Sequence, residues 1–188
     1  MLCENFSLTH ICSTCQTTFL TPQLYKRKLQ NGIEVISFYK YGEIKDLIHS
    51  KHTDIGYYIY TILAKLSFSK FSTEFRMQGD IVSIGIDDNV TSGYSHTSIL
   101  NKALKSKSIK PLYNKLRARN PVSYSGKSRE FRLLNPRDFQ TSDFKEKNVI
   151  LVDDVITTGS TLNQAILALR AIDKEVILCL TLTDAQVK

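Results

Sequence analysis

Apolar positions along the chain form two patterns: short continuous runs, and stretches in which they recur every three to four residues. The continuous runs predict buried β-strands over residues 34–41, 81–86, 149–152 and 176–182. The periodic stretches predict helices near residues 43–49, 55–68, 96–104 and 160–172. Strands that alternate with helices predict an α/β fold, with a parallel sheet flanked by helices on both faces.

The apolar run 149–152 leads directly into two acids and a hydroxyl-rich turn. Asp153 and Asp154 are predicted at the carboxyl end of that strand, where ligands bind in open α/β sheets. The turn can offer a phosphate its backbone N–H groups and hydroxyls, together with the partial positive charge of a helix amino terminus; its residues are Thr157, Thr158, Gly159, Ser160 and Thr161. Two carboxylates beside a phosphate suit ribose hydroxyls and Mg²⁺. A generic strand–turn–helix is the alternative interpretation.

The amino terminus carries residues of the kind that bind zinc. Cys12 and Cys15 have the Cys-x-x-Cys spacing that lets two thiolates hold one tetrahedral ion, and Cys3 and His10 lie nearby. Phe6 stands where a second such pair would end, so we expect His10 to complete a structural Zn²⁺ site. The alternative is an amino terminus with unrelated thiols.

Positive charge is concentrated in residues 101–137, although the whole chain has a net charge of only +7. This segment holds eleven Lys and Arg residues and one acid, with aromatic residues between them. Cations that neutralise phosphates and rings that stack on bases together suggest contact with a nucleic acid; the candidates are Lys105, Lys107, Lys115, Arg117, Arg119, Tyr113 and Tyr124. A solvated basic surface, or a loop that folds over a diphosphate, would have the same composition.

The length of 188 residues suits one α/β domain with a small appendage. We expect a zinc-knuckle-like segment over residues 1–22 and the main domain over 23–188, with the basic stretch 23–30 as a linker. The chain lacks a run of about 18 apolar residues and a secretory signal, which predicts a cytoplasmic protein whose cysteines are ligands or core residues. Cys179, inside an apolar run, is expected to be buried.

Residues 149–161 resemble the phosphoribosyl diphosphate signature of type I phosphoribosyltransferases. Together with the cysteine-rich start, the chain resembles the ComF/ComFC family of bacterial competence proteins. Further parallels are Phe38-Tyr-Lys-Tyr-Gly42, Lys51 ahead of Asp54, residues 92–96 and Arg129-Glu-Phe-Arg132. Where that family usually has Pro-Val-Pro and then Arg-Gly-Phe/Tyr-Asn-Gln, this chain has Ser83-Ile-Gly-Ile86 and Ser92-Gly-Tyr-Ser-His96.

The resemblance implies a phosphoribosyltransferase-like fold that binds phosphoribosyl diphosphate with Mg²⁺. It places Asp153 and Asp154 on the ribose hydroxyls, residues 157–161 on the 5′-phosphate and Lys51 on the diphosphate. It also implies a role in natural transformation, in which the protein receives single-stranded DNA at the cytoplasmic face beside other DNA-uptake proteins. A salvage phosphoribosyltransferase acting on a free base and a module that senses a phosphoribosyl metabolite are the alternatives. His49 and His96 are assigned no chemistry, and a surface position is an equal alternative for both.

Overall fold

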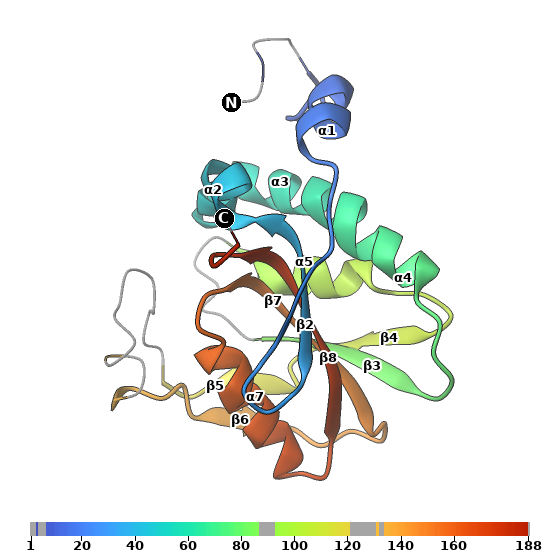
Figure 1. The fold of residues 1–188 in the computed structure, drawn as a ribbon, viewed down its shortest axis with the longest axis vertical. Helices are drawn as coiled ribbons and strands as arrows, with labels where there is room; N and C mark the ends of the chain where they lie inside the picture. Colours follow the sequence, from blue (N-terminus) through green and yellow to red (C-terminus); the bar gives the residue numbers. More distant parts are fainter. Residues whose placement is uncertain (1–2, 4–6, 87–92, 121–130, 132–133, 188) are drawn as a thin grey trace.

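The computed structural model describes residues 3, 7–86, 93–120, 131 and 134–187. Its centre is a six-stranded sheet in the order β1-β2-β8-β7-β3-β4 (Figure 1). The strands are β1 Tyr25–Lys28, β2 Glu34–Lys40, β3 Ile81–Gly85, β4 Ile109–Leu112, β7 Asn148–Ile156 and β8 Glu175–Asp184. β1 pairs with β2 in antiparallel fashion and the other pairs are parallel, which confirms the predicted α/β class.

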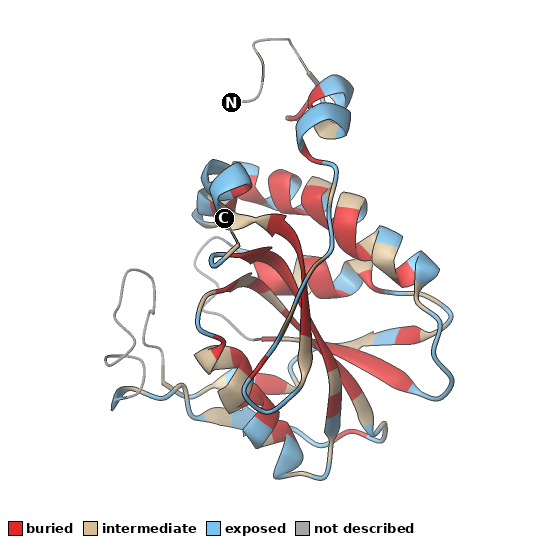
Figure 2. Ribbon diagram, in the orientation of Figure 1, coloured by how far each residue is buried: buried red, intermediate tan, exposed pale blue. Residues whose placement is uncertain are grey.

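Helices cover both faces of the sheet, as predicted. One face carries α2 Tyr41–His49, α3 Asp54–Ala64 and α5 His96–Ala103; α3 continues through the π-helical turn Lys65–Ser69 into α4 Lys70–Glu74. The other face carries α7 Ser160–Arg170. Figure 2 shows the buried positions concentrated in the strands and on the inward sides of the helices. The sheet therefore separates two hydrophobic cores.

Alternation along β7 assigns its side chains to the two cores. Ile150 and Val152 pack with the α3 and α5 side, whereas Val149 and Leu151 pack with α7. Successive strand residues face opposite sides of a sheet, so the adjacent Asp153 and Asp154 also diverge. The two acids consequently have different neighbours.

Two expectations about local structure were wrong, and one pair of strands was not expected. The strand predicted over residues 149–152 runs on to Ile156, because β8 continues to pair with it as far as Asp184. The expected linker 23–30 contains the edge strand β1, whose following residue Leu29 is buried. Two short strands in the basic segment and after it, β5 Leu116–Ala118 and β6 Phe139–Thr141, form a separate antiparallel pair that hydrophobic periodicity did not indicate.

The amino-terminal part projects from the helix-covered end of the sheet as a short segment with one helix, α1 Ser13–Phe19 (Figure 1). Within the described residues, no helix combines the length and the apolar character that crossing a bilayer requires.

Candidate phosphate-binding site

The turn between β7 and α7 has the backbone shape that a phosphate cradle needs. Gly159, the N-cap of α7, has φ +80°, and a Cβ placed there would lie 2.6 Å from Leu29 Cδ2. Only glycine meets both constraints easily. The hydroxyls of Thr158 and Ser160 are 2.8 Å apart, and the Gly159 carbonyl accepts the first helical hydrogen bond from Asn163. The first N–H groups of α7, which have no acceptor within the helix, lie at this turn.

Asp154 is buried, with 7% of its surface exposed, and its carboxylate has three partners. Oδ2 accepts from Lys51 Nζ at 2.9 Å and from the Tyr60 hydroxyl at 3.3 Å, and it lies 3.3 Å from His96 Nε2. Burial alone would raise the pKa of Asp154, but the charges of His96 and Lys51 and the hydrogen bonds from Lys51 and Tyr60 hold it well below its usual range. Asp154 is therefore an anion that the protein itself binds.

Asp153 is half-buried, and its Oδ1 accepts the N–H of Asp154 at 2.9 Å. Burial, reinforced by the negative charge of Asp154, raises the pKa of Asp153 to about 7. A bound cation would favour the ionised form of this carboxyl. Of the two predicted acids, Asp153 is thus the one whose charge a ligand or Mg²⁺ would control.

Lys51 is held by the short 3₁₀ helix Ser50–His52, which a tyrosine braces. The Tyr94 hydroxyl donates to the carbonyls of Lys51, at 2.9 Å, and Thr53, at 3.3 Å. A Cβ on Gly56 would lie 2.1 Å from the Ser50 carbonyl oxygen and 2.2 Å from the Tyr94 hydroxyl, so this packing requires glycine. The structure therefore brings the predicted Lys51 to the predicted Asp154.

Tyr60 and His96 are members of this network that the sequence did not identify. His96, to which the sequence assigned no chemistry, is 7% exposed, and its ring lies 5.4 Å from that of Tyr60, centroid to centroid. Its place at the first turn of α5, directly beyond β3, was the available signal, because that turn faces the end of the neighbouring β7. The sequence alone does not tell which helix packs against the end of which strand.

Three of the four predicted zinc ligands come together. The thiols of Cys3, Cys12 and Cys15 lie within 4.8 Å of one another, with Cys3 Sγ and Cys12 Sγ 3.4 Å apart. Tetrahedral zinc with Zn–S bonds of about 2.3 Å spaces its sulfurs roughly 3.8 Å apart, so the cluster fits such an ion. The Cys15 N–H, 3.4 Å from Cys12 Sγ, is the main cause of the lowered pKa of Cys12, whereas the hydrogen bond with Cys3, followed by burial, raises the pKa of Cys15 to about 12. The ring of His10, by contrast, packs against Tyr58 with centroids 4.3 Å apart.

The candidate DNA-binding residues fall into two groups at opposite ends of β4. Lys105 and Lys107 precede the strand, whereas the other described candidates follow it: Tyr113, Lys115, Arg117 and Arg119. In the second group Lys115 donates to the Asp143 carbonyl at 2.9 Å, Arg117 donates to Asn114 Oδ1 at 3.0 Å, and Arg119 lies 3.7 Å from Asp138. Tyr113 is 45% exposed. Tyr124, Ser92 and most of the 129–132 motif lie outside the described residues.

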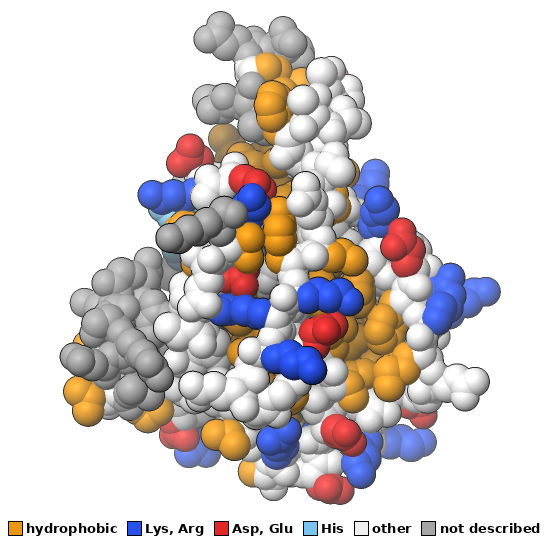
Figure 3. Space-filling view, in the orientation of Figure 1, with side chains coloured by type: hydrophobic (Ala, Val, Ile, Leu, Met, Phe, Trp, Pro, Cys, Tyr) orange, Lys and Arg blue, Asp and Glu red, His pale blue; other side chains and the backbone are white. Residues whose placement is uncertain are grey.

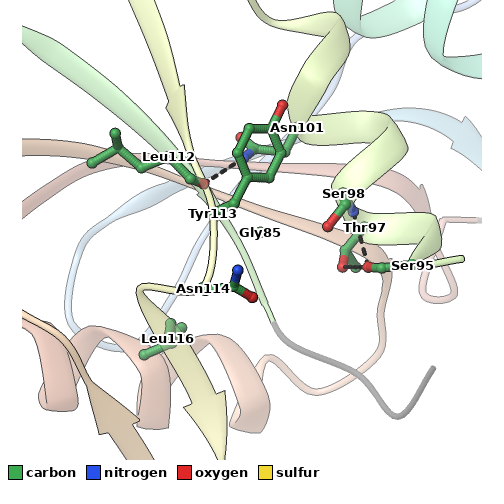
Figure 4. Close-up of a pocket in the computed structure, with 9 residues that line it drawn as sticks. All are labelled: Gly85, Ser95, Thr97, Ser98, Asn101, Leu112, Tyr113, Asn114 and Leu116. Carbon is green, nitrogen blue, oxygen red and sulfur yellow. Dashed lines mark hydrogen bonds between the residues drawn. The ribbon is translucent and has the colours of Figure 1, made fainter.

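A small polar pocket lies beside the site, between the carboxyl ends of β3 and β4 and the amino end of α5 (Figure 4). Its lining includes Gly85, Ser95, Thr97, Ser98 and Asn101. Asn101 Nδ2 donates to the Leu112 carbonyl at 2.8 Å, while its buried Oδ1 has no hydrogen-bond partner among the described residues. The pocket is therefore lined mainly by small polar side chains, and the Oδ1 atom of Asn101 is buried behind its surface.

Comparison with known families gives one match, which spans the turn. Residues 116–188, which include both acids and the whole turn, match the sequence model described as "Phosphoribosyl transferase domain". The chain carries a phosphoribosyltransferase-like domain. No curated protein sequence matches the chain significantly.

Solved structures with similarity to this phosphoribosyltransferase-like chain include three phosphoribosyltransferases. A hypoxanthine phosphoribosyltransferase from Staphylococcus aureus is 17% identical with a TM-score of 0.38, and the match covers 66% of this chain and 62% of that one. An orotate phosphoribosyltransferase from Aeropyrum pernix is 18% identical with a TM-score of 0.39, over 91% and 80% of the two chains. An adenine phosphoribosyltransferase is 15% identical with a TM-score of 0.41, over 93% and 91%.

Proposed function

We propose that this protein binds phosphoribosyl diphosphate with Mg²⁺ at the β7–α7 turn and handles incoming single-stranded DNA in the cytoplasm during natural transformation. The proposal that the protein binds phosphoribosyl diphosphate is supported by one observation: the turn lies next to two acids that differ in charge and in their contacts. Asp154 is fixed as an anion by Lys51, while Asp153 remains available beside residues 157–161. A ribose phosphate has complementary chemistry, because its hydroxyls suit carboxylates and its phosphate suits helix N–H groups.

Mg²⁺ would supply positive charge that offsets a diphosphate and lets Asp153 ionise. Hard cations of this kind take oxygen ligands, usually one or two carboxylates together with substrate phosphates and waters. Asp153 is the residue of the pair that could join such a shell, since Asp154 is already engaged by Lys51, Tyr60 and His96. Lys51, which lies beside Asp154, would add a positive charge close to the ligand.

The role in DNA handling rests on the resemblance to competence proteins and on two features of the molecule. One is the three-thiol cluster, which a salvage transferase does not need. The other is the group Tyr113, Lys115, Arg117 and Arg119, which joins an exposed ring to three cations after β4. On the face shown in Figure 3, Lys and Arg side chains are interspersed with Asp and Glu, so this face offers no continuous basic field. We favour the group after β4 as the DNA contact, because it combines an exposed ring with three cations.

The pocket is tested by calorimetric titration with phosphoribosyl diphosphate, with and without Mg²⁺. We expect saturable binding that depends on Mg²⁺ and that Asp153→Asn removes. Lys28→Ala, on the exposed side of β1, is the control for a change of one charge away from the pocket. Equal binding by the native chain and Asp153→Asn would refute the assignment.

The DNA contact is tested by fluorescence anisotropy across a salt series with single-stranded and duplex DNA. We expect the triple change of Lys115, Arg117 and Arg119 to Ala to weaken single-strand binding and to flatten the slope of log affinity against log salt, by about 0.7 for each phosphate that the variant no longer neutralises. The double change of Lys105 and Lys107 is the matched control at the other end of β4. Weaker binding by the control and not by the triple variant would move the contact to that end.

A transferase that acts on a free base is the second candidate, and the polar pocket favours it. The polar edge of a base could meet the hydroxyl groups of Ser95, Thr97 and Ser98, which line this pocket beside the site. Release of pyrophosphate on adding a purine or pyrimidine base to the protein with phosphoribosyl diphosphate and Mg²⁺ would support this activity. No release with any base, together with binding in the titration, would favour the DNA-handling role.

A further inference from the structure

The β1–β2 hairpin lies against the phosphate-binding turn, although the proposed function assigns it no part. In Figure 1 the hairpin crosses in front of α7. Leu29 packs against Gly159 closely enough to exclude a side chain there, and Asn31 Nδ2 donates to Asn163 Oδ1 at 3.0 Å. A segment that precedes the turn by 130 residues therefore covers its outer side.

Arg27, at the centre of β1, makes the polar contacts of this hairpin with the site. Its Nη2 donates to the Thr157 carbonyl oxygen at 2.7 Å, and its Nε lies 2.9 Å from Asp184 Oδ2. Nη1 donates to Gln186 Oε1. Asp184, at the end of β8, is 1% exposed, so the guanidinium is anchored on a buried carboxylate. A planar guanidinium fixed in this way holds the carbonyl in a defined direction.

The direction of that carbonyl determines what the turn presents to a ligand. In a planar trans peptide the C=O and the following N–H point in opposite directions. Because the Thr157 carbonyl points to Arg27, the N–H of Thr158 points away from it. The same contact keeps a carbonyl oxygen, which would repel an anion, turned from the inner side of the turn.

We propose that Arg27 is a positioning residue for a phosphate monoester bound at residues 157–161. It acts through the Thr157–Thr158 peptide, which it orients by the hydrogen bond to the Thr157 carbonyl, while the ion pair with Asp184 stabilises the hairpin in the fold. This role rests on the proposed function, since the monoester would be the 5′-phosphate of the phosphoribosyl ligand. It extends the site to the β1 strand, which lies outside the matched residues 116–188.

The test compares Arg27→Ala and Arg27→Lys with the native chain, in titrations with ribose 5-phosphate and with phosphoribosyl diphosphate plus Mg²⁺. We expect Arg27→Ala to weaken both ligands about tenfold or more, as the removal of a charge-assisted hydrogen bond does. Arg27→Lys should recover only part of this, because one ammonium cannot span both Thr157 and Asp184. Lys28→Ala removes the same charge from the next residue of β1 and should stay within about twofold of native.

A second variant separates positioning from stability. Asp184→Asn weakens the ion pair but leaves the Arg27–Thr157 hydrogen bond possible, so it should lower Tm while affinity stays within about threefold of native. The ¹⁵N-resolved amide signal of Thr158 should shift strongly in Arg27→Ala and little in Asp184→Asn. The proposal is overturned if Arg27→Ala binds as native does, or if Asp184→Asn loses as much affinity as Arg27→Ala. A native chain that binds neither ligand would defeat the proposed function and this role with it.

Discussion

The imidazole of His10 packs on the ring of Tyr58, with centroids 4.3 Å apart and planes inclined by 35°. Tyr58 meets Tyr57, and Tyr57 meets Tyr94, each nearly edge to face. Tyr94 then donates to the Lys51 carbonyl. A row of rings thus connects the amino-terminal segment with the loop that carries Lys51, and His10 is the ring that joins the cysteine-rich segment to α3.

The contact with Tyr58 indicates that His10 packs on a ring, whereas the sequence predicted it to be a zinc ligand. We expect one zinc per chain by elemental analysis, and the joint change of Cys12 and Cys15 to Ser should remove it, because a structural site needs its thiolates. His10→Ala should keep the zinc, since the ring packs on Tyr58 and lies outside the three-thiol cluster. Zinc loss in His10→Ala would instead identify His10 as the fourth ligand, as the sequence predicted.

Removal of the Asp154 carboxylate should destabilise the protein. Asp154→Ala would leave Lys51 and His96 without their shared anion in a mostly buried position. We expect a decrease of about 2–4 kcal/mol in the free energy of unfolding, measured by urea denaturation at pH 7. Asp154→Asn, which keeps the shape and can still accept from Tyr60, should be less destabilised. Of the two acids, Asp154 is therefore the one that stabilises the fold. Unchanged stability in Asp154→Ala would show that its contacts with Lys51, Tyr60 and His96 do not contribute.

Substitution of Gly159 should disturb the turn for two separable reasons. Gly159→Ala places a Cβ 2.6 Å from Leu29 Cδ2 and forces a side chain onto a residue with φ +80°. We expect a decrease of about 1–3 kcal/mol in stability by thermal or urea unfolding, together with weaker phosphate binding. Gly159→Ala combined with Leu29→Ala should relieve the contact but not the backbone strain. If the double variant binds phosphate as the native chain does, the Leu29 contact alone explains the effect.

Sequence reasoning reached the residues that are contiguous in the chain and missed those that meet through the fold. The acids, the turn and the helix after it share one uninterrupted pattern, and Lys51 was found by resemblance. Tyr60 and His96 gave no such signal, because their role depends on α3 and α5 lying against the end of β7. Arg27 was read as part of a linker, since a four-residue edge strand rich in Lys and Arg has no apolar period. The role that we propose for Arg27 depends on the hairpin folding over α7.

The raised pKa of Asp153 predicts opposite effects of pH on stability and on ligand binding. Burial, followed by the charge of Asp154, raises this pKa from 3.8 to about 7, so the folded protein holds the proton more tightly than the unfolded chain does. The stability that the protonated carboxyl contributes is complete below about pH 4 and disappears as the pH rises through 7. Asp153→Asn should therefore be more stable than the native chain at pH 8, by at most about 4 kcal/mol, and nearly equal to it at pH 4.

Binding of phosphoribosyl diphosphate with Mg²⁺ should follow the other direction. The carboxylate form of Asp153 is the one that can meet Mg²⁺ or ribose hydroxyls, so affinity should rise between about pH 6 and 8 and level off once Asp153 is ionised. Mg²⁺ itself should lower the midpoint of this rise, because a nearby cation favours the carboxylate. Calorimetric titrations at several pH values and two Mg²⁺ concentrations measure both effects, with the proton released per ligand bound obtained from buffers of different ionisation enthalpy. Affinity that is constant over this range, with no proton released, would show that Asp153 is already ionised in the free protein.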